Sequence, residues 1–244
     1  MTYCVGMLLD QGLVMAADSR TSAGPDRVAT FQKLSVFEDP GERVFVLCTA
    51  GNLSITQSVI SILEDGIAGK NGHPNLLEAE SMYGAARLVG RAVREVFDED
   101  GAALKAHNLD FNASILLGGQ VKGGELCLFE VYAAGNFIEA SADTPYLQIG
   151  EVKYGKPLID RVLTSATSLR EAVKCALISF DSTMRSNVTV GPPIDLAIVK
   201  RGSQRTALRM RLEESNPYWR RIGTLWSEGL NTAFAAVPDP DWPI

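Results

Sequence analysis

Residues 1–20 read MTYCVGMLLDQGLVMAADSR, and this stretch decides how the fold begins. Two apolar runs, residues 2–9 and 13–17, flank Asp10-Gln11-Gly12, which has the length and turn chemistry of a short β-hairpin. Antiparallel pairing returns the end of the second strand to the start of the first. We therefore expect Asp18 to lie beside Thr2 at one end of a sheet.

The rest of the chain alternates blocks of strands and helices. Strand-like runs at residues 34–37 and 44–50 extend the opening hairpin to a block of four strands. Helices are expected at residues 55–64 and about 80–97, where apolar residues recur at helical spacing. A second block of strands covers residues 113–121, 125–133 and 137–140. A helix opened by the capping box at Ser168, a strand pair at residues 194–199 and 207–210, and a helix after Asn216 complete the order.

This order predicts an α+β protein with two antiparallel sheets covered by helices, because it lacks the regular strand–helix alternation of a doubly wound sheet. The 244 residues are 46% hydrophobic and 21% charged, which is typical of a globular chain. We found no repeat and no linker long enough to divide two cores. We therefore expect a single domain over residues 1–244, with residues 238–244 as a proline-rich tail.

The composition also weighs against several classes of function. A net charge of -6 without a clustered basic face argues against nucleic acid as a partner. No basic leader opens the chain and no run approaches about 18 apolar residues, so we expect a cytoplasmic protein that does not enter a membrane. The four cysteines have no CxxC spacing, and neither His73 nor His107 has a partner at metal-ligand spacing. We expect no metal and no organic cofactor.

The second residue carries the most unusual chemistry in the sequence. Removal of Met1 would leave Thr2 with a free α-amine beside its own hydroxyl. The reference pKa of that amine is about 7.7–8.0, so part of it is unprotonated at neutral pH and can accept the hydroxyl proton. Nucleophile and base then share one residue, a known way to activate a hydroxyl without histidine. The alternative is that the chain begins Met-Thr by chance.

Three further residues strengthen the hypothesis of a hydrolase. Asp18 arrives through the hairpin, and the ammonium of Lys33, just before the strand at residues 34–37, would favour a deprotonated hydroxyl. Gly51, between a strand and a helix, offers a backbone N–H to a developing oxyanion. Taken singly, each has a plain structural interpretation: a turn or capping acid, a solvated lysine and a glycine turn. The three residues together with Thr2 favour the hydrolase over these separate structural interpretations.

The chain resembles the proteasome β-subunit family of N-terminal nucleophile hydrolases, and most closely its bacterial branch Anbu, the ancestral β-subunit. Five stretches carry the likeness: MTYCVG (1–6), GLVMAADSRT (12–21), FQK (31–33), TAGN (49–52) and SFDSTMRSN (179–187). Together they span most of the chain. The resemblance implies a four-layer α-β-β-α sandwich, with two antiparallel sheets between helical layers.

The same resemblance implies a role for each matching residue. Thr2 would be the nucleophile and, through its amine, the base; Lys33 would tune the hydroxyl and Asp18 would orient Lys33. Gly51 would supply the oxyanion contact, and the late pair Asp181 and Ser186 would support the terminal amine. The sequence departs from the family at two points. The separation of Asp181 from Ser186 is longer than in the family, and Glu151 replaces a supporting serine.

The leading hypothesis is a threonine peptidase that hydrolyses peptide bonds in peptides or unfolded proteins through Thr2, after removal of Met1. Two alternatives stay open: a catalytically weak or silent assembly subunit, and a narrow amidohydrolase for small amides. The resemblance also implies a homo-oligomer, either a closed ring or an open spiral. An ATP-dependent unfoldase is a possible partner that nothing in the sequence identifies. The proline-rich tail offers Trp242 as an anchor for a neighbouring subunit.

Overall fold

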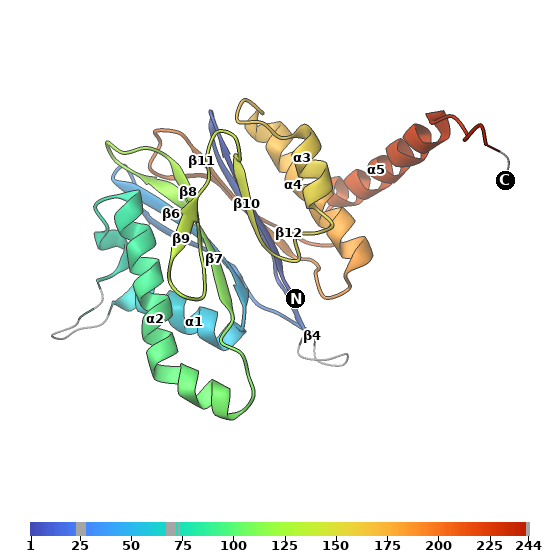
Figure 1. Cartoon of the computed structure of the whole chain (residues 1–244). Coiled ribbons are helices and arrows are strands. Elements are labelled where there is room, and N and C mark those ends of the chain that lie inside the picture. Colours follow the sequence, from blue (N-terminus) through green and yellow to red (C-terminus); the bar gives the residue numbers. More distant parts are fainter. Residues whose placement is uncertain (23–27, 67–71, 73, 243–244) are drawn as a thin grey trace.

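The computed structural model describes residues 1–22, 28–66, 72 and 74–242, and within them the fold has four layers. Two five-stranded antiparallel sheets lie face to face, and helices cover the outer face of each (Figure 1). The predicted α+β class is confirmed, as is the α-β-β-α sandwich implied by the resemblance.

The first sheet holds the N-terminal strand in its interior. Its order is β10-β1-β2-β11-β12. The strands span Tyr3–Leu9 (β1), Gly12–Asp18 (β2), Tyr146–Gly150 (β10), Ile194–Lys200 (β11) and Thr206–Leu212 (β12). Cys4 pairs with Ala17 across the opening hairpin, as predicted, while Tyr3 pairs with Gly150 on the other side. The start of β1 is therefore fixed from both flanks.

The second sheet has the order β5-β6-β7-β8-β9. Its strands span Leu34–Asp39 (β5), Arg43–Gly51 (β6), Ala113–Val121 (β7), Cys127–Val131 (β8) and Phe137–Glu139 (β9). The four strands expected at the start of the chain are present as two hairpins, with β1 and β2 in the first sheet and β5 and β6 in the second. Turn chemistry specifies the partner within a hairpin but not the strand on its other side, so the sequence did not assign the hairpins to sheets.

Helices shield the outer faces of both sheets (Figure 1). They span Leu53–Asp65 (α1), Met82–Ala106 (α2), Lys156–Val162 (α3), Leu169–Ser186 (α4) and Pro217–Ala236 (α5), with a 3-10 turn at Leu76–Glu78 (η1). Asn52, Ser81, Ser168 and Asn216 cap the N-termini of α1, α2, α4 and α5 through their side chains. The helix expected to end near residue 97 continues to Ala106, past Gly101.

Three apolar layers hold the sandwich together. One lies between α1, α2 and the second sheet, and another between α3, α4 and the first sheet. The third lies between the two sheets, where Met15 of β2 and Leu128 of β8 are among its fully buried members. Side chains of one strand alternate between two layers, so β1 and β2 are buried on both faces.

Five short elements were not predicted: β10, α3, η1, and the hairpin of β3 (Arg20–Ser22) and β4 (Val28–Thr30). Each has seven residues or fewer, too few for a periodic pattern to stand out.

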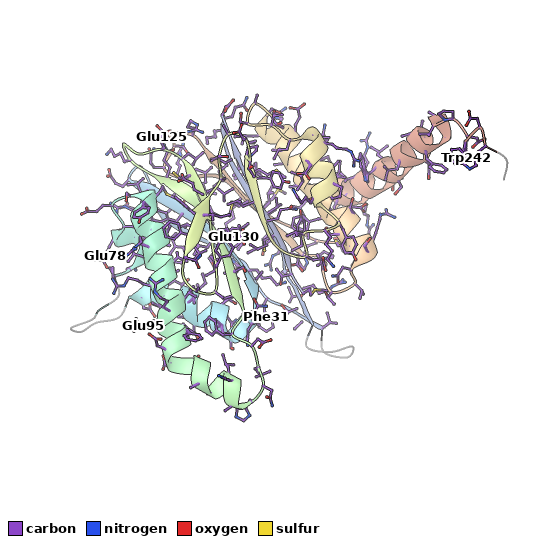
Figure 2. The ribbon with its side chains drawn as sticks, in the orientation of Figure 1. Phe31, Glu78, Glu95, Glu125, Glu130 and Trp242 are labelled. Carbon is purple, nitrogen blue, oxygen red and sulfur yellow. The ribbon has the colours of Figure 1, made fainter. Side chains whose placement is uncertain are left out.

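The last helix leaves the body of the molecule. Trp219 and Ile222 of α5 are buried, but every residue from Glu228 to Trp242 is exposed. In Figure 1 the helix projects as an arm, and Trp242 lies at its far end in Figure 2. We define residues 228–242 as the C-terminal arm. Within the described ranges, no helix is both long enough and apolar enough to cross a membrane.

Candidate active site

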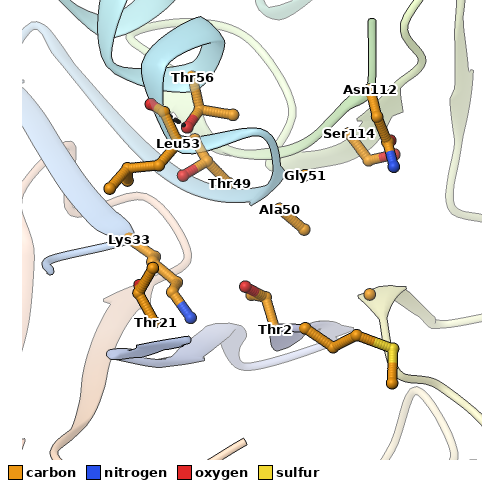
Figure 3. A pocket seen from close by; sticks show the side chains of 12 residues that line it. Thr2, Thr21, Lys33, Thr49, Ala50, Gly51, Leu53, Thr56, Asn112 and Ser114 are labelled. Carbon is orange, nitrogen blue, oxygen red and sulfur yellow. Dashed lines mark hydrogen bonds between the residues drawn. The ribbon is translucent and has the colours of Figure 1, made fainter. Parts of the chain in front are cut away.

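Thr2 immediately precedes β1 and faces a pocket of about 430 Å³. The pocket walls come from the N-terminus, from the junction of β6 with α1, and from the start of β7. In Figure 3 the Thr2 hydroxyl and the Lys33 ammonium both point into this space. Only 8% of Thr2 is exposed, so access to its hydroxyl is through the pocket.

A buried ion pair lies next to Thr2. Lys33 Nζ is 2.9 Å from Asp18 Oδ1, and their side chains are 5% and 0% exposed. Asp18 Oδ1 also accepts a hydrogen bond from the backbone N–H of Tyr3 at 3.1 Å, which confirms that the hairpin returns Asp18 to the start of β1. Its other oxygen accepts from the N–H of Gly191 at 3.3 Å.

Burial and these contacts act in opposite directions on the pKa of Asp18. Burial raises the pKa of the Asp18 carboxyl above its ordinary value, and the Lys33 ammonium is the main influence that opposes this rise. The ammonium donates a second hydrogen bond to the carbonyl oxygen of Arg20 at 2.5 Å. Lys33 is thus held by two acceptors, with its charge at the wall of the pocket.

Gly51 ends β6 and lines the pocket where α1 begins. Its φ of +114° lies in the left-handed region, and a Cβ added there would be 2.3 Å from the carbonyl oxygen of Asn112. Only glycine therefore fits this close passage of two strands. Thr21 lines the same pocket, and its buried hydroxyl oxygen has no hydrogen-bond partner within the described residues. A bound substrate can satisfy that oxygen.

A second polar group adjoins the N-terminus on the side of β10. The backbone N–H of Glu151 donates to the carbonyl oxygen of Thr2 at 2.7 Å. Its carboxylate is 4% exposed and accepts a hydrogen bond from Asn187 Nδ2 at 2.9 Å. Asn187 was not predicted, although its place as the C-cap of α4, next to Ser186, was a signal in the sequence.

The late pair from the sequence analysis is not brought to Thr2. Asp181 forms an ion pair with Arg185 at 2.9 Å and lies against Gly223 of α5. Ser186 is the exposed last residue of α4. Asp181 and Arg185 are about one helical turn apart, so both lie on the face of α4 that packs toward α5. Asn187 is the residue at this end of α4 that lies near the N-terminus.

No three His, Cys, Asp or Glu side chains of the described residues form a group that could hold a metal ion. His107 caps the exposed end of α2, and His73 lies outside the described residues. Cys4, Cys48 and Cys175 are buried free thiols, and burial raises the pKa of Cys175 to about 11.

No protein-family model and no curated protein matches the chain. Solved structures do match it. Anbu (ancestral beta-subunit) from Yersinia bercovieri is 49% identical, with a TM-score of 0.91 over 99% of this chain and 100% of that chain. The chain belongs to the Anbu family. This confirms the resemblance drawn from the sequence and makes the protein a proteasome-like β-subunit.

Two further Anbu structures agree. The protein in the helical assembly of the Anbu complex from Pseudomonas aeruginosa is 47% identical, with a TM-score of 0.91 over 98% of both chains. The Anbu Gly-1 mutant from Hyphomicrobium sp. strain MC1 is 46% identical, with a TM-score of 0.90 over 99% of this chain and 100% of that chain. In this Anbu subunit, Thr2, Lys33 and Gly51 line one pocket and Asp18 is ion-paired with Lys33, whereas Asp181 and Ser186 are not among the lining residues.

Proposed function

We propose that this Anbu subunit is a threonine peptidase that hydrolyses peptide bonds through Thr2 once Met1 has been removed. One observation carries the proposal: the Thr2 hydroxyl and the Lys33 ammonium face the same pocket, and Asp18 holds that ammonium at 2.9 Å. A buried, oriented cation beside a hydroxyl favours the alkoxide that forms as the hydroxyl loses its proton.

The chemistry follows from this arrangement. The free α-amine of Thr2 takes the proton of its own hydroxyl as Oγ attacks the substrate carbonyl carbon. The resulting oxyanion is stabilised by the backbone N–H of Gly51, beside the N-terminus of α1. The protonated α-amine of Thr2 then gives this proton to the leaving amine of the substrate. The C–N bond of the substrate breaks, and the acyl group stays on Thr2 as an ester. Water hydrolyses the ester, releases the acid and restores the hydroxyl.

Met1 decides whether this chemistry is available. While Met1 is attached, the Thr2 nitrogen is a peptide amide and cannot act as a base. Met1 is 64% exposed at the edge of the pocket, where a processing enzyme can reach it. The proposal therefore requires that Thr2 is the first residue of the active protein.

Intact-mass analysis tests the proposal in two steps. The mass of the purified protein establishes whether Met1 has been removed, and incubation with a peptide β-lactone then tests Thr2. We expect one covalent adduct on the chain that begins at Thr2, none on Thr2→Ala and a retained adduct on Thr2→Ser. The absence of an adduct on a chain shown to begin at Thr2 would refute the peptidase.

Two alternatives give different results in the same sample. A catalytically silent subunit forms no adduct and releases no product from any substrate. A narrow amidohydrolase forms the adduct but cleaves small amides and not peptides. A panel of fluorogenic peptides and small amides therefore separates the three.

We further propose that the subunit forms homo-oligomers. The C-terminal arm leaves Leu230, Phe234 and Val237 exposed. A helix as short as the helical part of the arm, residues 228–236, is marginal in water without a packing partner. The related Pseudomonas aeruginosa protein is described as a helical assembly, which supports self-association of this chain. Light scattering at several protein concentrations tests it, and a constant monomer mass would refute it.

A further inference from the structure

Glu151 is a buried carboxylate with little compensation for its charge. Asn187 gives it one neutral hydrogen bond at 2.9 Å, and Lys153 lies 3.6 Å from its other oxygen. The Lys153 side chain is 73% exposed, so water screens that ion pair. An ionised carboxylate accepts more hydrogen bonds than these, and its burial favours a further cationic partner.

Asn187 holds this carboxylate in a defined direction. Its side-chain oxygen accepts hydrogen bonds from the backbone N–H and the hydroxyl of Thr189, at 3.0 and 2.6 Å. The amide nitrogen of Asn187 must then face Glu151, because the oxygen is already engaged by two donors. Asn187 Nδ2 also lies 4.0 Å from Met1 Sδ, so the Glu151–Asn187 pair adjoins the space that Met1 fills.

The ladder between β1 and β10 places the Thr2 nitrogen on the same side. In an extended chain, the N–H and C=O of one residue point to the same neighbouring strand, and the next residue points to the opposite one. The Thr2 carbonyl faces Glu151, and the Tyr3 N–H faces Asp18. The Thr2 nitrogen is therefore directed toward β10 and Glu151, away from the ion pair of Asp18.

We propose that Glu151, oriented by Asn187, binds the α-ammonium of Thr2 in the processed chain and keeps it protonated to higher pH. The inference rests on the proposed function. It makes Glu151 a positioning residue, which acts on the nucleophile through the amine. Removal of Met1 supplies Glu151 with a second cationic partner, on the side away from solvent-exposed Lys153, since the amide nitrogen of Thr2 then becomes an ammonium.

The other charges near the amine do not cancel this effect. Lys33 is compensated by Asp18, and the Arg20 guanidinium is directed to the carbonyl oxygen of Val188 at 2.9 Å. Lys153 acts against Glu151, but from the solvent-exposed side. A nearby opposite charge favours the protonated amine, so the basic form that attacks appears only at higher pH. Reactivity should then rise toward alkaline pH.

The decisive experiment measures the amine directly. Full-length chain that begins at Thr2, confirmed by intact mass, is labelled with 15N-threonine, and the α-amine is titrated by NMR. We expect Glu151→Gln, which keeps the size and one hydrogen bond, to lower the titration midpoint by about one pH unit. Glu125→Gln removes an equal charge at a side chain that is 88% exposed and should leave the midpoint unchanged. Equal midpoints for Glu151→Gln and the parent chain would overturn the inference.

Two further measurements exclude a merely structural effect. The rate of adduct formation with the β-lactone near pH 7 should rise about tenfold in Glu151→Gln, because more of the amine is unprotonated. A rate that falls by the same factor at every pH would contradict the inference. Lys153→Gln, a surface change, should move the midpoint in the opposite direction. Failure of the parent chain to form an adduct at any pH would refute the peptidase alone, since the amine titration needs no catalysis.

Discussion

Replacement of Lys33 by Met tests the buried ion pair at the centre of the site. Methionine has a similar length and no charge, so the change removes the ammonium and leaves the space filled. Asp18 keeps its hydrogen bonds from the N–H groups of Tyr3 and Gly191. It loses its only ion-pair partner among the described residues.

The expected loss of stability follows from these contacts. Removing one partner of a buried ion pair typically costs about 3–5 kcal/mol, because the other charge stays buried and unpaired. The lower end of this range of free energies applies here, since the two backbone N–H donors to Asp18 remain and Asp18 can take up a proton. We therefore expect Lys33→Met to lose about 3 kcal/mol of unfolding free energy at pH 8.

The unfolding free energy lost in Lys33→Met should depend on pH, and the titration of Asp18 determines in which direction. Burial already raises the pKa of Asp18, and without Lys33 that pKa rises further. A carboxyl whose pKa is raised by folding adds stability at pH below its unfolded pKa and loses that contribution as the pH climbs through the folded pKa. The deficit of Lys33→Met relative to the parent chain should therefore be smaller at pH 5 than at pH 8.

Urea unfolding at the two pH values measures this deficit. The double variant Lys33→Met with Asp18→Asn leaves neither member of this pair charged, so it should be more stable at pH 8 than Lys33→Met alone. Lys122→Gln is the matched control, because its ion pair with Glu42 is exposed and should contribute less than about 1 kcal/mol. An equal loss at both pH values, or a double variant less stable than Lys33→Met, would refute the reasoning.

Two further predictions concern backbone geometry and assembly. Gly51→Ala should cost about 2 kcal/mol or more, since alanine disfavours a φ of +114° and its Cβ would meet the Asn112 carbonyl. Gly229→Ala, on an open helical surface, should instead stabilise α5 by about 0.5–1 kcal/mol, and thermal unfolding that ranks the two variants in the opposite order would contradict us. Phe234→Asp should lower the assembled mass seen by light scattering, because this ring is 83% exposed on the C-terminal arm. A mass equal to that of the parent chain would show that the arm is not the interface.

Much of the architecture could be predicted from local patterns. The hairpin of β1 and β2 has a short turn and two apolar runs, which together specify the pairing that returns Asp18 to the start of β1. Capping residues and helical periodicity placed α1, α2, α4 and α5, and the resemblance supplied the layered arrangement. Thr2, Lys33 and Gly51 were singled out because the hypothesis of a hydrolase needs a nucleophile, a cation and an oxyanion donor, and the structure places all three at one pocket.

The remainder depends on contacts between distant segments. β10 was missed because five residues give little pattern, and its place beside β1 comes from pairing between residues about 140 positions apart. Glu151 and Asn187 meet only because β10 and the end of α4 both reach the N-terminus. Asp181 was placed at the site by its motif, but the helix turns its side chain toward Arg185 and α5.

The interior position of β1 has a consequence for the order of events on the ribosome. The strand that carries Thr2 is made first and can pair with β2 at once, but its other neighbour ends at Gly150. Asp18 needs the N–H of Gly191 as well, so the site is complete only after more than three quarters of the chain has been synthesised. A nascent or truncated chain thus carries the threonine without its surroundings.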